Sequence, residues 1–225
     1  MHDGIMRNLA LVKEMEAFSK FDSVLDVGGE KKSQKIFFPD KKFHIVNIFN
    51  STQEEDVGFT LSSAADMPFE DGSFDLVVSS DTLEHIPFED RNKAINEMIR
   101  VAKKRVFLLV PCDQHSKKYE KKVLKLGLFF KRNMKWLREH EECGLPMSSE
   151  IEKTILENNN VDKLSVKNNH NIYAWYFGSL INPLVRAVFS NLDRTKLIKF
   201  WKFWKLFDKG NNSYRKIFII DKKMN

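Results

Sequence analysis

The chain has 225 residues, 42% hydrophobic and 30% charged, which excludes a disordered chain and predicts one ordinary globular domain, residues 1–225. Its net charge of +6 and pI near 9.1 suit an anionic substrate, an acidic membrane surface or nucleic acid, but equally simple solubility. The two cysteines, Cys112 and Cys143, give neither a disulfide framework nor metal-site spacing, so no metal is expected.

No targeting or membrane segment is predicted. The start, Met1 to Arg7, has no basic stretch followed by an apolar run, and no run of about 18 uncharged apolar residues occurs. We therefore expect a cytoplasmic protein without a transmembrane segment.

Predicted strands and helices alternate along the first half of the chain. Apolar residues at helical spacing predict a helix over 5–20, and a β-branched run predicts a strand at 23–27 that ends at Gly28-Gly29. The same patterns predict strands at 43–49, 58–61, 74–79 and 105–110, and a helix at 90–101.

The second half continues with fewer elements. Ser148 and Ser149 are predicted to cap a helix through Asn158, because Glu152 follows Ser149 by three positions. Strands are predicted at 161–166 and 214–220. The region 172–212 between them is too long for a simple connection and is predicted to be a helical insertion.

This order of elements predicts an α/β fold with a mostly parallel sheet. Ligands of such sheets bind outside the carboxyl ends of the strands. The turn at Gly28-Gly29 would let backbone approach a ligand closely, although a strand followed by glycine is a weak signal alone.

Residues 66–85 carry a more specific signal. They read DMPFEDGSFDLVVSSDTLEH and closely resemble small-molecule class I S-adenosylmethionine-dependent methyltransferases, in which an LPF-x-D-x-SFD segment leads into strand four and LEH follows. Residues 25–28, LDVG, are similar to the first motif of that family. The resemblance covers about residues 22–111. It implies a Rossmann-like, seven-stranded sheet with an antiparallel last strand, helices on both faces, and S-adenosyl-L-methionine as cofactor.

The resemblance also implies site residues. Asp26, Gly28 and Gly29 would border the methionine part of the cofactor, and Asn47 would meet the ribose. The residues implied at the adenine and at the sulfonium are Ser63, Ala64 and Asp66, and Ser79 and Ser80, respectively.

Several positions depart from the family. Glu30 and Lys32 stand where it has glycines, and Asn47 and Ser63 replace acidic residues. Because charged hydrogen bonds are about twice as strong as neutral ones, each loss would cost about 1–3 kcal/mol. The alternative function is therefore a degenerate, non-catalytic methyltransferase fold kept for binding or as a scaffold.

Two histidines are candidate catalytic residues. His85 follows Glu84 and could act as a general base, although such a pair also organises a loop. His140 opens a segment, 140–146, that resembles methyltransferases of surface-glycan pathways; the alternative is a helix ended by Gly144. The expected acceptor is a small molecule or a surface-glycan intermediate of polysaccharide biosynthesis, including a lipid-linked one.

Residues 195–207 form a basic aromatic segment. As a helix, it would place Trp201 and Trp204 on one face and Lys202 on the other. Such a helix would make a peripheral membrane contact or cover a substrate. Alternatively, its aromatic face packs on the sheet.

Two other enzyme classes fit poorly. Nucleic-acid amino methylation normally uses an Asn/Asp-Pro-Pro-aromatic segment where this chain has Ser79-Ser80-Asp81, and Cys112 lacks a partner motif for cytosine C5 chemistry. Nicotinamide oxidoreduction is disfavoured because the first turn lacks Gly-x-Gly-x-x-Gly.

Overall fold

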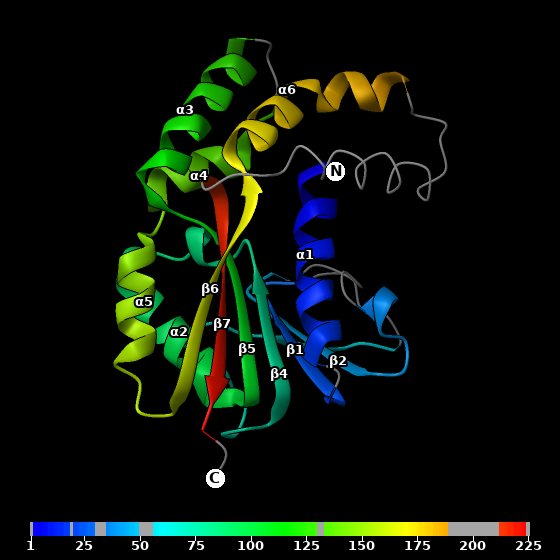
Figure 1. Cartoon of the computed structure of the whole chain (residues 1–225), viewed down its shortest axis with the longest axis vertical. Helices are drawn as coiled ribbons and strands as arrows, with labels where there is room; N and C mark the ends of the chain where they lie inside the picture. The colour runs from blue at the N-terminus through cyan, green and yellow to red at the C-terminus, as the bar shows by residue number, and fades with distance from the viewer. Residues whose placement is uncertain are drawn as a thin grey trace.

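The computed structural model describes residues 2–18, 20–29, 35–49, 56–129, 133–188 and 212–223. Within them one seven-stranded sheet runs in the order β3-β2-β1-β4-β5-β7-β6, with helices packed on both faces (Figure 1).

The strand bounds lie close to the predicted ones. They are β1 Ser23–Val27, β2 Lys42–Asn47, β3 Gly58–Leu61, β4 Phe74–Ser80, β5 Ala102–Pro111, β6 Val161–Asn171 and β7 Ser213–Lys222. The helices are α1 His2–Phe18, α2 Phe88–Val101, α3 Asp113–Phe129, α4 Lys135–Cys143, α5 Ser148–Leu156 and α6 Ile172–Val188, with short 3-10 turns η1 Lys35–Phe37 and η2 Leu83–His85.

The pairing confirms the predicted mostly parallel sheet with an antiparallel last strand. Strands β1 to β5 pair in parallel, and β7 runs antiparallel to both β5 and β6. The carboxyl ends of β1, β2 and β4 therefore meet at one edge of the sheet, where ligands of open α/β sheets bind.

Each face of the sheet has its own apolar core. Helices α2 and α5 cover one face, where Ala94, Ile95, Met98 and Ile99 of α2 are buried as predicted. Helix α1 covers the other face with buried Leu11 and Met15. Central strands buried on both faces explain the near-continuous apolar runs in their sequences.

Helices α3, α4 and α6 gather beyond the carboxyl ends of β5 and β6 (Figure 1). Their shared core includes fully buried Trp175 of α6, which stacks on Tyr214 of β7 with ring centroids 3.9 Å apart. The sequence predicted neither α3 nor α4. Helix α6 occupies the start of the predicted insertion at 172–212; the rest of it, with the predicted helix at 195–207, lies outside the described residues.

The predicted start and end of α5 are wrong. Met147 is the N-cap, Ser148 and Ser149 are the first helical residues, and the helix ends at Leu156. Ser148 does not cap because Asp113 binds both its groups: the Ser148 amide donates to Oδ1 at 2.8 Å and the hydroxyl to Oδ2 at 3.0 Å. In the part of the chain described, no helix is both long and apolar enough to cross a membrane.

Candidate functional site

The turn after β1 excludes side chains. Gly28 has a positive φ of 77°, and its amide donates to the Val46 carbonyl at 2.8 Å. A Cβ atom on Gly28 would collide with the Thr82 side chain, and one on Gly29 with the carboxyl group of buried Asp26. Bare backbone at this edge is therefore a geometric requirement of the fold.

The end of β4 is fastened to the same turn. The Val27 carbonyl accepts hydrogen bonds from the Ser79 hydroxyl at 3.2 Å and the Thr82 hydroxyl at 3.1 Å. Ser79 is fully buried, so this hydroxyl supports the backbone. The buried Ser80 hydroxyl has no hydrogen-bond partner among the described residues. Of these two predicted cofactor residues, Ser80 has the hydroxyl still available.

Asn47 lies against the glycine turn, as the predicted ribose contact requires. Its amide nitrogen donates to the Gly29 carbonyl at 3.1 Å, and its side-chain oxygen accepts from the Phe49 amide at 3.2 Å. The side chain thus joins the ends of β1 and β2, and both of its polar atoms already have a backbone partner.

The predicted adenine residues form a closed turn after β3. The Asp66 amide donates to the Ser63 carbonyl at 3.2 Å, and the Ser63 hydroxyl accepts from the Ala65 amide at 3.1 Å. Ala64 packs against the sheet core. These residues shape the turn, and their bonds leave the Ser63 hydroxyl proton free to face a ligand.

Asp81 is a site residue that the sequence did not reveal. It follows β4 with a positive φ of 52°, and its carboxylate binds Arg7 of α1 at 2.9 Å and Arg215 of β7. These arginines lie 74 and 134 positions away, and no local pattern links them to Asp81.

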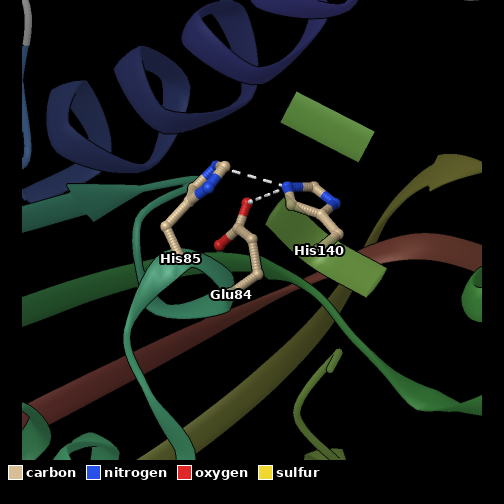
Figure 2. A group of neighbouring side chains, drawn as sticks. All are labelled: Glu84, His85 and His140. Carbon is tan, nitrogen blue, oxygen red and sulfur yellow. Dashed lines mark hydrogen bonds and ion pairs between the residues drawn. The ribbon is translucent and has the colours of Figure 1, made fainter. Parts of the chain in front are cut away.

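The two predicted catalytic histidines lie together. Figure 2 shows Glu84 and His85 from η2 facing His140 from α4. The Nε2 atoms of the two imidazoles are 3.2 Å apart, and Glu84 Oε1 lies 3.8 Å from His140 Nε2. Glu84 is fully buried and His140 is 3% exposed, whereas His85 is partly exposed.

Carboxylates surround the outer sides of both rings. Glu120 of α3 lies 2.9 Å from His140 Nδ1 and accepts a hydrogen bond from the Tyr214 hydroxyl at 2.5 Å. Glu139 lies 3.2 Å from His85 Nδ1. Glu120 and Glu139 are also residues that the sequence did not reveal, because their helices were not predicted.

The cluster perturbs its own ionisation. Burial, reinforced by Asp81, raises the pKa of Glu84 to about 8. Burial and the neighbouring His140 lower the pKa of His85. Burial would also lower the pKa of His140, but the hydrogen bond and charge of Glu120 outweigh it and raise the pKa. Such shifts are typical of functional sites.

The segment 140–146 follows the structural alternative raised from its sequence. Gly144 ends α4 with a φ of 73°, as a helix-terminating glycine does. Arg91 of α2 donates to the carbonyls of Cys143 and Gly144, which holds the segment beside η2. This anchoring fixes the position of His140 against His85.

Comparison with known proteins identifies a domain family. Residues 40–110 match the family model described as a methyltransferase domain. Ajmaline N-methyltransferase of Rauvolfia serpentina is 32% identical over 122 residues, which are 50% of this chain and 41% of that protein. Tocopherol O-methyltransferase of Arabidopsis thaliana is 41% identical over 59 residues, 25% of this chain and 16% of that protein. The chain thus spans less than half the length of these curated relatives.

Solved structures share the fold. Phosphoethanolamine N-methyltransferase 2 of Haemonchus contortus, in complex with S-adenosyl-L-methionine, aligns with a TM-score of 0.60 at 19% identity over 96% of this chain and 52% of that one. Magnesium protoporphyrin IX methyltransferase of Synechocystis aligns with a TM-score of 0.56 at 13% identity over 96% and 82%. Together with the domain match, they confirm the family that residues 66–85 resemble.

Proposed function

We propose that this chain, a class I methyltransferase by fold and domain, transfers a methyl group from S-adenosyl-L-methionine to a small molecule. The observation that carries the proposal is the glycine turn after β1, where Gly28 and Gly29 admit no side chain and lie beside Asp26 and Asn47.

The donor would bind across the carboxyl ends of β1, β2 and β4. Asp26, Gly28 and Gly29 would border its methionine part, and Asn47 its ribose. The adenine would meet the turn of Ser63, Ala64 and Asp66. The Ser80 hydroxyl, buried without a hydrogen-bond partner among the described residues, would lie beside the sulfonium, with Ser79 supporting it from the backbone.

The acceptor would enter beneath α3, α4 and α6. Methyl transfer from a sulfonium needs chiefly alignment of nucleophile, methyl group and sulfur, together with exclusion of water. Partly exposed His85 would face the acceptor, and buried His140 would position it. An amine acceptor agrees with the names of the ajmaline and norajmaline N-methyltransferases to which this chain is similar.

A narrower acceptor is a surface-glycan intermediate of polysaccharide biosynthesis, lipid-linked in one form. The resemblance of segment 140–146 supports it, and that segment adjoins the His85–His140 pair. In that case the protein would work in the cytoplasm at the membrane surface, with 195–207 as its contact. The predicted single domain over 1–225, with its insertion at 172–212, would provide the acceptor cover.

Calorimetric titration with S-adenosyl-L-methionine and S-adenosylhomocysteine tests the donor site. We expect micromolar binding that Asp26→Asn weakens at least tenfold. Asp22→Asn is the matched control, because the Asp22 side chain is 91% exposed at the opposite end of β1. Binding by neither compound at millimolar concentration would contradict the enzyme.

A non-catalytic binding or scaffold protein is the second candidate. It is favoured by Asn47, whose amide oxygen and nitrogen are both engaged by backbone groups where the family has a carboxylate. It predicts that Asn47→Asp restores donor binding to a chain that otherwise binds none, and the same titration separates the two functions.

A further inference from the structure

The two histidine rings face each other through nitrogen atoms that both lack a proton. Because an ionised carboxylate only accepts hydrogen bonds, we assign the ring protons to His140 Nδ1, beside Glu120, and His85 Nδ1, beside Glu139. The neutral rings then point two Nε2 lone pairs at each other across 3.2 Å. That arrangement is repulsive unless a positive charge lies between them.

A buried carboxylate points at the same place. Both oxygens of Glu84 are buried and accept no hydrogen bond from the described residues, although Oε1 lies 3.8 Å from His140 Nε2. A buried polar group without partners is costly, so it usually marks a ligand or ion. Together, Glu84, His85 and His140 offer one oxygen and two nitrogen atoms that all lie within 4.8 Å of one another.

We propose that Glu84, His85 and His140 bind a divalent transition-metal ion, Zn²⁺ in the first place. With Zn–N bonds of about 2.0–2.1 Å at a tetrahedral angle, two ligand nitrogens stand about 3.3 Å apart. The Nε2 atoms are separated by 3.2 Å. Imidazole with carboxylate is a donor set that suits zinc better than magnesium or calcium, which prefer oxygen alone.

The outer hydrogen bonds match those of known metal sites. A metal-binding histidine typically donates its other ring proton to a carboxylate, which fixes the tautomer and orients the ring. Glu120 does this for His140 and Glu139 for His85. Tyr214 in turn holds Glu120. The carboxylates also supply the negative charge that a divalent cation needs in a buried place.

The ligand count leaves a position for chemistry. Three protein ligands with a fourth position open is the arrangement of catalytic rather than structural zinc sites. His85, the partly exposed ligand, puts that position toward the side where the acceptor would enter. The metal site does not depend on donor binding, so it stands or falls independently of the proposed methyltransferase activity.

Metal titration of the whole chain, stripped with a chelator and free of donor, tests the site. Zn²⁺ is followed by calorimetry and Co²⁺ by its visible absorption. The variants are His85→Gln and Glu84→Gln, with His115→Gln as the control, because His115 is an exposed histidine on α3 outside the cluster. Circular dichroism and urea melts check that each variant folds.

We expect wild type and His115→Gln to bind one equivalent with the absorption of four-coordinate Co²⁺. His85→Gln and Glu84→Gln should weaken binding at least tenfold while remaining folded. Absence of binding in wild type would overturn the proposal and leave a proton-sharing histidine pair. Equal binding by all four proteins would also overturn it and indicate an adventitious ion only. Titration with S-adenosylhomocysteine tests the donor site separately.

Discussion

The guanidinium of Arg215 makes two hydrogen bonds to the carboxylate of Asp81, from Nε to Oδ1 at 2.5 Å and from Nη2 to Oδ2 at 2.7 Å. Arg215 is 1% exposed. Arg7 adds a third bond from α1. The last strand and the first helix are thereby fixed to the loop that follows β4, directly before η2 and its histidine.

Replacement of Arg215 by Met should destabilise the protein strongly. Removing one partner of a buried ion pair leaves the other charge uncompensated and costs about 3–5 kcal/mol. The exposed pair of Lys153 and Glu157 on α5 is the control, since Lys153→Ala should cost less than about 1 kcal/mol. Urea denaturation measures both, and equal losses would contradict the structural role of Arg215.

Two glycines with similar backbone angles separate strain from close approach. Gly28 has a φ of 77° and Gly144 a φ of 73°, but only at Gly28 would a Cβ collide with Thr82. Gly144→Ala should cost about 1–2 kcal/mol of backbone strain. Gly28→Ala should cost more, because Thr82 must also move, and should weaken donor binding at least tenfold. Similar effects of the two variants on calorimetric binding would argue against a donor site at this turn.

Helix α6 depends on one aromatic residue. Trp175 is fully buried on Tyr214, whereas Phe177 on the same helix is 55% exposed. Trp175→Ala should destabilise the protein by about 3–5 kcal/mol, as large-to-small core substitutions do. Phe177→Ala should change the unfolding free energy by less than about 0.5 kcal/mol. Denaturant unfolding followed by far-UV circular dichroism compares them.

Sequence patterns predicted most of the sheet because its strands are short, β-branched and bounded by turn residues. Ser23–Val27 and Gly58–Leu61 were placed without error, and α2 was given the correct buried face. The end of β5 at Pro111 also agrees with the prediction. Local chemistry decides these elements, so local patterns suffice.

The site was predicted only in part because its contacts join distant residues. Residues 66–85 pointed to His85, but the 3.2 Å contact with His140 depends on α4, which no prediction included. Buried Val123, Leu124 and Leu137 have helical spacing that could have indicated α3 and α4. Which carboxylate each histidine meets follows from packing alone.

Acid should weaken the attachment of β4 to the start of β1. Burial would raise the pKa of Asp75, but hydrogen bonds from Lys104 and from the Asp22 and Ser23 amides outweigh it and lower the pKa. The unfolded chain therefore binds the proton first. The stabilisation is complete above the ordinary carboxyl pKa of about 4 and is lost as the pH falls through the lower folded value. Asp75→Asn should cost about 1–3 kcal/mol at pH 7 and progressively less below pH 4, by urea denaturation. A difference between wild type and variant that does not change with pH would contradict this.

Glu120 should tune the proposed metal site without being a ligand. It orients His140 through Nδ1, and loss of such an outer carboxylate typically lowers metal affinity about 10–100-fold. Glu120→Gln should therefore weaken Zn²⁺ binding by that factor. Tyr214→Phe, which removes only the hydroxyl that bonds Glu120, should keep the affinity within about threefold, because the carboxylate remains against the ring. Calorimetry on the two variants gives the comparison, with urea melts to separate affinity from stability. Unchanged affinity in a folded Glu120→Gln would show that His140 is not held for a metal.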